Sequence, residues 1–488
     1  MATDSRSLPT DTALTETHPA SAYANALLRE LGAPPALQAR AEPHPALRWA
    51  QSGAMALTGA EDGDPQVCPV PLASCADGLI AALSALSGSR ALRGLDGARL
   101  LGERAALAGY RRRGLTAPGG SCRLLPAADG ALAVNLPRES DWQLLPAWLE
   151  AGVVSDWPGI ARVLAGRGVR EWVARGRLLG LAVAPLAGEP VAAPWCETHC
   201  RGAQQAHEPP ATPLVIDLSS LWAGPLCAQL LRLMGARVIK VESSARPDGL
   251  RLAGTPFYHL LNAGKASVAL DFSEPRGRAE LRELLLCADI VIEASRPRAL
   301  RQLGICAESI LGERPGLTWI AISGYGRAEP QGNWVAFGDD AGVAGGLSQL
   351  LAASTGRALF CADAVADPLT ALHAALAAWS SYQSGGGRLL SLALAAVVAH
   401  AVRSAALTDL AARERAAAWG RRIAPATVAA PWARPVRESA RPLGADTAAV
   451  LATFKRGARI ALQREVSAAR RPASRPKNVA SASDSPEL

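Results

Sequence analysis

The chain has 488 residues, of which 49% are hydrophobic and 19% are charged, and its net charge is +8. Arg, Asp or Gly interrupts every long apolar run, and five of the eight net positive charges fall after Phe454, so neither a membrane span nor a basic nucleic-acid-binding face is expected. The polar, acidic N-terminus and nine scattered Cys residues favour a cytoplasmic protein with free thiols.

The first part of the chain is predicted to be mostly helical. We expect a flexible arm over residues 1–22 and then, over residues 23–199, Ala/Leu-rich helices with a small domain. Asp129-Gly130 stands between two apolar runs, which is typical of a hairpin turn. Residues 200–213 are polar and Pro-rich and are the best linker candidate.

The sequence CETHC, which ends at the first residue of this linker, resembles part of a metal-binding motif. It contains Cys196, His199 and Cys200, but no second ligand cluster is near it in the sequence. A tetrahedral metal centre needs further ligands, so we expect no metal to be bound here.

Beyond the linker, strand and helix patterns alternate over residues 214–445. This alternation predicts an α/β fold: a Rossmann-like parallel sheet with helices on both faces, in addition to the smaller α+β domain and further helices. A ligand is expected at the carboxyl ends of the strands. The first strand–helix turn, SSLWAGPLCAQ, lacks the GxGxxG spacing of a nicotinamide dinucleotide site. Residues 446–488 are predicted to be mostly a disordered basic tail.

A weak internal repeat connects the two parts of the chain. Residues 72–86 parallel residues 365–379, and residues 52–59 parallel residues 341–350. Ser74 occupies the place of Asp367 in the first pair. Shared Ala/Leu composition is an alternative explanation of the similarity.

Two charged residues invite either a structural or a chemical interpretation. Asp367 precedes Pro368 at the start of an apolar helix, so it is either an N-cap or a nucleophile that attacks an activated acyl group. Lys265 precedes a strand and is either an exposed loop residue or a contact to a phosphate.

An ordered series of motifs gives the chain a family resemblance. VIDLSSLWAGPLCAQLLRLMGARVIKVESSARPDGLR, LNAGKASVALDF, RPRALRQLGI, ISGYG and ADPLTALHAALAAW occur in this order between Leu214 and Phe454. Together they resemble the class III CoA-transferases, the CaiB/BaiF family that includes formyl-CoA and carnitine CoA-transferases.

This resemblance implies a function and its residues. The Rossmann-like domain would bind coenzyme A, and Asp367 would become acylated by an acyl-CoA donor and then carry CoA as a thioester. The substrates would be an acyl-CoA and a small carboxylic acid, with no permanently bound cofactor. The residues implied to line the CoA site are Leu221, Trp222, Asn262, Lys265 and Arg296. The family's ENFRPG reads EASRPR here, with Ala294 and Ser295 in place of Asn and Phe.

Two alternative functions remain open. The first is a 2-methylacyl-CoA racemase or epimerase, although the position expected to hold its histidine is Asp339. The second is a CoA-binding subunit that has lost catalysis.

The order of the segments predicts an unusual assembly. The first part resembles what normally follows the Rossmann segment in this family, so the chain looks like a fused tandem that has lost pieces. We therefore expect residues 45–190 to pack on residues 214–445 as an internal pseudo-dimer, with a homodimer also open. Ser74, in the first copy, is expected to be inactive.

Overall fold

The central feature of the molecule is a seven-stranded sheet in the order β4-β10-β9-β8-β5-β6-β7. A computed structural model describes residues 18–39, 41–188, 191–205 and 212–454. All neighbouring strands are parallel except the β4–β10 pair. The predicted Rossmann-like parallel sheet is confirmed, with one antiparallel edge strand added. The strands are β4 (Glu197–Arg201), β5 (Leu214–Asp217), β6 (Arg237–Ser243), β7 (Ala266–Leu270), β8 (Ile290–Glu293), β9 (Thr318–Ser323) and β10 (Arg388–Ala393).

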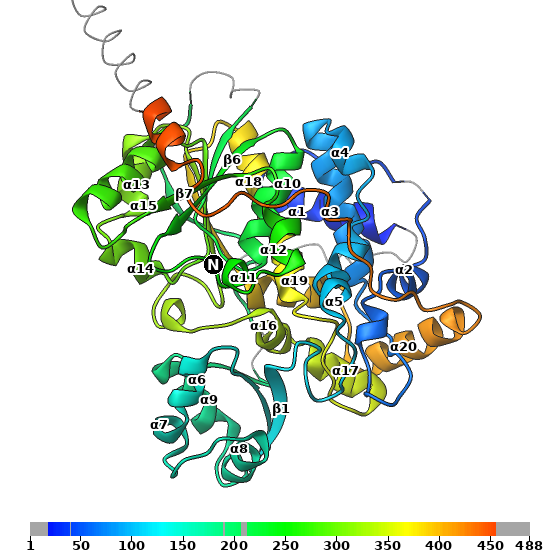
Figure 1. The fold of residues 1–488 in the computed structure, drawn as a ribbon. Coiled ribbons are helices and arrows are strands. Elements are labelled where there is room, and N and C mark those ends of the chain that lie inside the picture. The colour runs from blue at the N-terminus through cyan, green and yellow to red at the C-terminus, as the bar shows by residue number, and fades with distance from the viewer. Residues whose placement is uncertain (1–17, 40, 189–190, 206–211, 455–488) are drawn as a thin grey trace, which may run out of the picture.

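Helices cover both faces of this sheet (Figure 1). α10 (Ala223–Leu233) and α18 (Ala366–Gln383) pack on one face, and α13 (Pro275–Cys287) and α15 (Ala307–Glu313) pack on the other. Successive residues of β5 enter different cores: Val215 packs with α10 and α18, and Ile216 packs with α13 and α15. Strands buried on both faces explain the uninterrupted apolar runs in the sequence.

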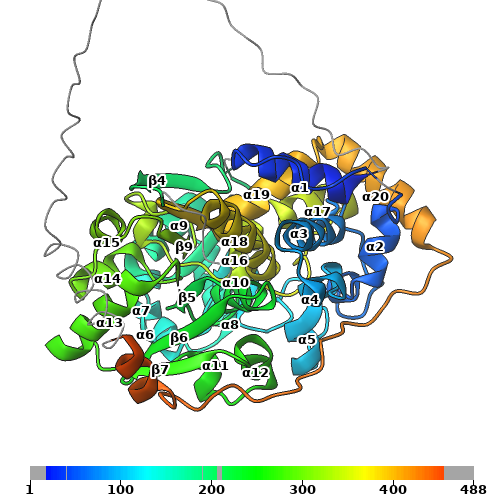
Figure 2. The same cartoon turned by 90° about the horizontal axis from the view of Figure 1, so that it is seen from above.

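The N-terminal helices continue the core on the α10 and α18 face (Figure 2). Residues of α1 and α3 share one hydrophobic cluster with residues of α10 and α18. Tyr23 of α1 also lies 2.8 Å from His373 Nε2 of α18 in a buried hydrogen bond. These N-terminal elements are α1 (Pro19–Glu30), α2 (Pro45–Gln51), η1 (Met55–Leu57), α3 (Leu72–Ser87), α4 (Arg90–Arg93), η2 (Ala98–Gly102) and α5 (Glu103–Ala108).

The expected arm over residues 1–22 is therefore wrong at its end, because α1 begins at Pro19. Proline suits the first turn of a helix, where its missing N–H costs no hydrogen bond. Residues 1–17 lie outside the described part of the chain.

The structure extends the predicted internal repeat to α1 and α10, but it does not support the part of the repeat over residues 52–59. α1 carries Leu-Leu-Arg over residues 27–29 and α10 carries the same three residues over 230–232; Gly32 and Gly235 follow, both with positive φ. α1 packs on α3, and α10 packs on α18. Residues 52–59, in contrast, form only a 3-10 turn where their proposed counterparts form α-helices.

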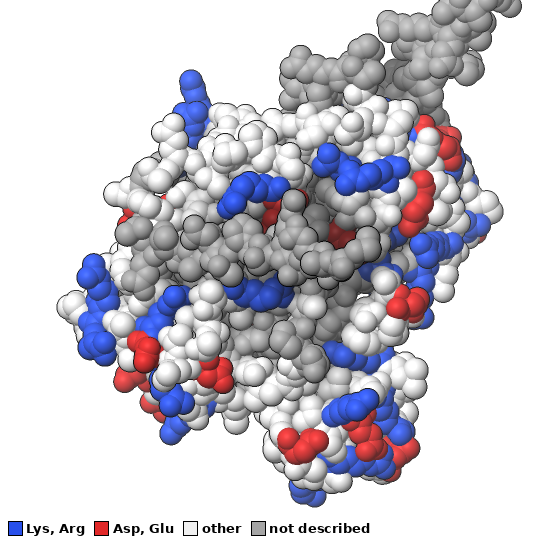
Figure 3. Space-filling view, turned by 180° about the vertical axis from the view of Figure 1, so that it is seen from behind, with Lys and Arg blue, Asp and Glu red and all other residues white. Residues whose placement is uncertain are grey.

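The small domain forms a separate lobe (Figure 1). Its three-stranded sheet is antiparallel, and Ala127 pairs with Gly130 across the predicted hairpin, which is confirmed. The lobe has its own core around Trp148 and Trp172. Figure 3 shows acidic and basic side chains interspersed on its surface. The elements are β1 (Cys122–Ala127), β2 (Gly130–Asn135), β3 (Ala182–Pro185), α6 (Glu139–Gln143), α7 (Leu145–Leu149), α8 (Trp157–Leu164) and α9 (Val169–Leu179).

The remaining elements connect the sheet to the two ends of the molecule. They are α11 (Gly249–Leu252), α12 (Pro256–Asn262), α14 (Pro297–Gln302), η3 (Gln331–Asn333), α16 (Gly338–Ala344), α17 (Leu347–Thr355), α19 (Leu394–Ser404) and α20 (Asp409–Ile423). Within the described ranges no single helix is long and apolar enough to cross a membrane; α19 and α20 meet the criterion only jointly, with a 77° bend between them.

A C-terminal strap, residues 424–450, runs from α20 to the edge of the sheet (Figure 2). The Ala429 amide donates to the Ala50 carbonyl, Arg434 forms a two-pronged ion pair with Glu103, and Asp446 accepts the Ser267 amide of β7. Val450 is buried, so the tail predicted from residue 446 begins too early. Residues 455–488 lie outside the described part.

The linker predicted over residues 200–213 also begins too early. β4 extends to Arg201 and pairs with β10, and residues 206–211 are not described. In β4, His199 Nε2 lies 3.1 Å from Glu197, and no group of three or more metal-ligating side chains occurs among the described residues.

Candidate active site

Asp367 is the second residue of α18, but its side chain does not cap that helix. The N-cap is Val365, and no side chain caps the first turn, so the capping interpretation of Asp367 is wrong. The carboxylate instead lies near the backbone N–H of Ala223, the first residue of α10, which lowers the pKa of Asp367 against the effect of burial. Two helix N-termini therefore meet at this carboxylate, and both favour its negative charge.

Two further carboxylates and one guanidinium lie beside Asp367. Arg104, from α5, donates from Nε to Asp363 Oδ2 over 2.8 Å and from Nη2 to Asp363 Oδ1 over 2.6 Å. Its Nη2 is 4.0 Å from Asp339 Oδ2, and Asp339 Oδ1 accepts the Ala364 amide over 2.8 Å. Three acidic side chains thus share one cation.

Crowding of these carboxylates affects their protonation. Burial raises the pKa of Asp367 to about 7; Arg104 opposes the rise, whereas Asp339 and Asp363 add to it. Burial and the Asp363 charge likewise raise the pKa of Asp339 to about 6. Shifts of this size from desolvation and like charges are common at functional sites. Asp363 is fully buried, but Asp367 is partly exposed and remains accessible.

Gly338, the first residue of α16, closes one side of the Asp367 carboxylate. A Cβ at Gly338 would lie 2.2 Å from Asp367 Oδ2 and 2.4 Å from the Ala364 carbonyl oxygen. Such distances are well inside van der Waals contact, so only glycine allows the backbone of α16 to approach this closely.

Arginines follow the carboxyl ends of the two strands that flank β5. Arg296 and Arg298 follow β8, Arg246 follows β6, and all three are exposed. Burial and then the charges of Arg298, Arg138 and Arg246 lower the pKa of Arg296. Arg138 is paired with Asp141, but within the described part of the chain no carboxylate pairs with the other three. Guanidinium groups without acidic partners suit a ligand that carries several phosphate charges. The sequence analysis found Arg296 alone.

Residues 213–431 match the model of CoA-transferase family III. The resemblance expected from the sequence is confirmed over this segment. The chain is 30% identical over 191 residues to succinyl-CoA–D-citramalate CoA-transferase of Chloroflexus aurantiacus, covering 37% of this chain and 48% of the relative. It is 31% identical over 197 residues to succinate–glutarate CoA-transferase of Agrobacterium fabrum, covering 37% and 49%. The chain thus spans about half the length of these curated relatives.

A solved CaiB/BaiF family protein from Brucella suis is also similar. It is 27% identical, the match covers 40% of this chain and 55% of that one, and the TM-score is 0.36.

The residues implied to line a CoA site fall into two groups. Leu221 belongs to the first: its φ of +68° is unusual for a residue with a side chain, and 40% of it is exposed. Its amide donates to the Asp248 carboxylate over 3.2 Å. This strained loop presents the apolar side chain of Leu221 beside the strand ends that the arginines follow.

Trp222 is oriented differently, because its ring is buried. Its centroid is 5.1 Å from that of Phe257, in an edge-to-face arrangement, and the guanidinium of Arg104 stands 5.3 Å from the ring centroid. Trp222 therefore supports the cation that faces the acidic cluster. Its indole N–H has no hydrogen-bond partner in the described structure.

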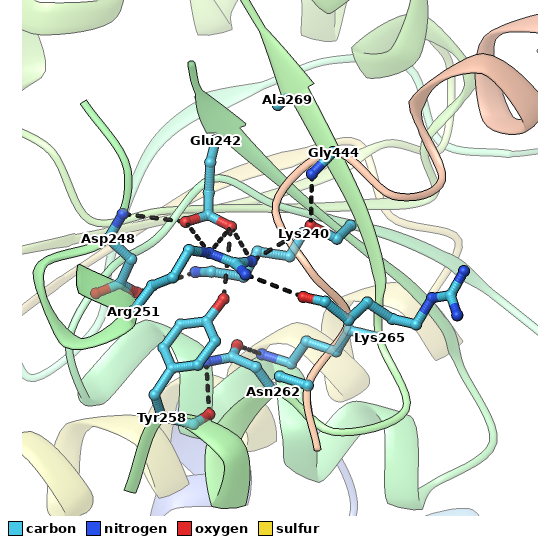
Figure 4. A network of polar contacts seen from close by, with 12 residues as sticks. Lys240, Glu242, Asp248, Arg251, Tyr258, Asn262, Lys265, Ala269 and Gly444 are labelled. Carbon is cyan, nitrogen blue, oxygen red and sulfur yellow. Dashed lines mark hydrogen bonds and ion pairs between the residues drawn. The ribbon is translucent and has the colours of Figure 1, made fainter. Parts of the chain in front are cut away.

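Asn262 and Lys265 lie inside the protein (Figure 4). Lys265 Nζ donates to Asp217 Oδ2 over 2.8 Å, to the Pro225 carbonyl over 2.9 Å and to Asn262 Oδ1 over 3.0 Å. Burial disfavours the Asp217 charge, but Lys265 and Lys240 outweigh it and lower the pKa of Asp217. All three protons of the Lys265 ammonium group are used, so the expected phosphate contact has no support from this geometry.

A neighbouring network, which the sequence analysis missed, fixes the loop after β6 (Figure 4). Lys240 Nζ lies 3.2 Å from Asp248 Oδ2 and donates to the Ser219 carbonyl over 2.8 Å. Arg251 forms an ion pair with Glu242. Because Asp248 holds the Leu221 amide, this buried network positions the turn that precedes α10. Charged residues at strand ends are the only signal of it in the sequence.

Ser74 is the residue that the predicted repeat aligns with Asp367. It lines a cavity of about 1220 Å³, where Arg48 and Asp77 form an ion pair. The amides of Ala20 and Ser21, which match Ala223 and Gly224 in the helix repeat, donate to Glu42 over 2.8 and 3.0 Å. The first copy thus has a carboxylate at its helix N-terminus, but from a different element.

Proposed function

We propose that the chain is an acyl-CoA:carboxylate CoA-transferase in which Asp367 is the nucleophile. The observation that carries the proposal is a partly exposed carboxylate at two helix N-termini, inside the segment that matches CoA-transferase family III. The nearby arginine cluster is suited to the phosphates of coenzyme A.

The proposed reaction begins with attack by an Asp367 carboxylate oxygen on the acyl thioester. The C–S bond breaks, and an aspartyl anhydride and CoA thiolate form. The thiolate then attacks the aspartyl carbonyl, releasing the donor carboxylate and leaving CoA on Asp367 as a thioester. The acceptor carboxylate attacks that thioester, expels the thiolate and forms a second anhydride. The thiolate attacks the acyl carbonyl of this anhydride, which produces the new acyl-CoA and restores Asp367.

The residues around Asp367 have distinct roles in this scheme. The Ala223 amide donates to whichever aspartyl oxygen carries negative charge during each attack. The leaving group is a thiolate, so no general acid is needed for its departure. Arg296, Arg298 and Arg246 would hold the nucleotide phosphates, and Leu221 would contact the nucleotide. CoA enters and leaves as a substrate and is not a resident cofactor.

The racemase alternative has less support. It needs a pair of bases that move the α-proton between two faces of the substrate. Asp339, at the position expected to carry its histidine, already accepts the Ala364 amide and faces Arg104. A CoA-binding subunit without catalysis remains the second alternative, because the first half of the chain lies outside the family match.

The test is Asp367→Asn. We expect transfer from succinyl-CoA to glutarate, D-citramalate or oxalate to fall at least 1,000-fold, on the order of what loss of a covalent nucleophile costs. CoA binding should change less than about threefold, since the amide fits the same space. Wild-type protein incubated with succinyl-CoA should form a hydroxylamine-sensitive adduct on Asp367, detected by peptide mass spectrometry.

The matched control is Ser74→Ala, at the corresponding position of the first copy. Its turnover should stay within a few-fold of wild type. An Asp367→Asn protein that still transfers CoA contradicts the proposal. Exchange of the α-proton of a 2-methylacyl-CoA with deuterium, without transfer, would support the racemase, and CoA binding without either reaction would support the inactive subunit.

A further inference from the structure

The acidic cluster around Asp367 is completed by a residue from outside the family match. Arg104 lies in α5, whereas the match begins at residue 213. It reaches Asp363 across 259 positions of the sequence, in a two-pronged ion pair. Arg104 is the cation among the groups that the structure places next to Asp367. The segment that carries the proposed nucleophile therefore depends on the first half for its charge balance.

Four segments place a charged or polar group near Asp367. α16 supplies Asp339, the loop before α18 supplies Asp363, α10 supplies the Ala223 amide and α5 supplies Arg104. Three carboxylates with one guanidinium carry two uncompensated negative charges when all are ionised. Such a cluster favours the retention of a proton.

The ion-pair geometry assigns the guanidinium to Asp363. Asp363 has both oxygens on Arg104, at 2.6 and 2.8 Å, and is fully buried. Its lone pairs are directed to the guanidinium and it has no access to a substrate. Asp367, by contrast, forms no ion pair as close as this one among the described residues, lies near the Ala223 amide and is partly exposed.

Building on the proposed function, we propose that Arg104 is a positioning residue for Asp367: by neutralising Asp363, it leaves Asp367 as the carboxylate free to react. Trp222 and Tyr110 hold the guanidinium in place, with ring centroids 5.3 and 5.8 Å from its central carbon. The first half of the chain thus controls the charge of a nucleophile carried by the second half.

The test compares Arg104→Gln, Asp363→Asn and the double variant. The pH dependence of single-turnover adduct formation on Asp367 is measured with succinyl-CoA. Arg104→Gln should move the acidic limb of this profile up by about one pH unit, because one positive charge within a few ångströms is removed. Asp363→Asn should move it down. The double variant loses one charge of each sign, so its limb should return close to that of wild type.

A purely structural role for Arg104 predicts a different pattern. Loss of the ion pair would then lower stability and activity at every pH. The acidic limb of the profile would stay at the same pH, and the double variant would be no more active or stable than either single variant. Arg434→Gln is the matched control, since Arg434 forms a similar two-pronged pair with Glu103 one residue from Arg104. It should reduce the melting temperature without moving the limb.

A second measurement is independent of turnover. The melting temperature of Asp367→Asn relative to its parent is followed with pH, in the wild-type and Arg104→Gln backgrounds. The pH at which the difference levels off reports the ionisation of Asp367, and it should be higher in the Arg104→Gln background. An inactive Asp367→Asn with equal profiles in both backgrounds overturns the role of Arg104 only, whereas transfer by Asp367→Asn overturns the proposed function.

Discussion

The charge of one residue, Asp367, determines the pH range in which the proposed chemistry can run. Burial and the neighbouring Asp339 and Asp363 raise its pKa to about 7. A carboxylate must be ionised to attack an acyl group, so the reactive form is lost as the pH falls through this value.

We expect kcat/KM for transfer to fall about tenfold per pH unit below pH 6 and to level off above pH 8. The profile should be recorded with a donor and an acceptor whose own carboxylates are ionised throughout. Asp340 is a useful control, because its pKa is also raised to about 7, mainly by burial, yet it is hydrogen-bonded to Asn135. Asp340→Asn should retain most of the acidic fall in the kcat/KM profile. If that fall disappears in this variant, the titrating group is Asp340.

The sequence indicates Asp367 but not what surrounds it. A lone acid before an apolar helix, inside an ordered series of family motifs, is a local signal. Arg104 has no such signal, because its partner is 259 residues away and the contact exists only once the halves have packed. For Lys265 the local pattern is misleading, because a lysine before a strand suggests an exposed cation. The ammonium group is instead buried, and three hydrogen-bond acceptors around it compensate the cost of burial.

At the scale of one element, α16 contains two glycines in different surroundings. A Cβ at Gly338 would lie 2.2 Å from Asp367 Oδ2, whereas a Cβ at Gly342 would meet Val365 Cγ1 at 3.6 Å. The helix is the same, so any general effect of alanine on helix propensity is shared.

Gly338→Ala should therefore lower the transfer rate at least 100-fold and destabilise the protein by about 1–3 kcal/mol, as overpacking does. Gly342→Ala should leave the rate unchanged and stabilise the protein by roughly 0.5–1 kcal/mol, because alanine restricts the unfolded chain. Initial rates and thermal unfolding of the two variants decide the matter. Equal effects at both positions would show that the approach of α16 to Asp367 is unimportant.

Elements with strong local patterns are predictable from the sequence, and elements defined by a partner are not. The β1–β2 hairpin and the apolar strands of the main sheet follow from turn residues and continuous hydrophobic runs. The end of β4, Cys200 and Arg201, falls in the predicted linker because the side chains there are polar and mostly exposed; β4 is a strand through its pairing with β10. The start of α1 was predicted too late, since its first turn, from Pro19, was assigned to the arm over residues 1–22.

For the whole molecule, the shared core is the main argument for the internal pseudo-dimer that we propose. α1 and α3 enter the same hydrophobic cluster as α10 and α18, and the C-terminal strap contacts α2 and α5 before it reaches the sheet edge. Independent domains bury much less apolar surface against each other.

Cleavage between the halves should consequently not separate them. A protease site placed between residues 205 and 212 should yield two fragments that co-elute in size-exclusion chromatography and retain CoA transfer. The control is a site in the β1–β2 turn, at residues 128–129, which divides the small domain and should reduce its stability. Fragments that separate without denaturant would contradict the pseudo-dimer.

The C-terminal strap also bears on how the protein avoids self-association. β7 is the last strand of the large sheet, and such a strand presents unpaired amides that invite another chain to extend the sheet. Here Asp446 accepts the amide of Ser267 and Thr447 accepts that of Ala269. The C-terminal strap therefore blocks the open edge of β7, and a chain cut short after α20 would expose two unpaired amides as a template for aggregation.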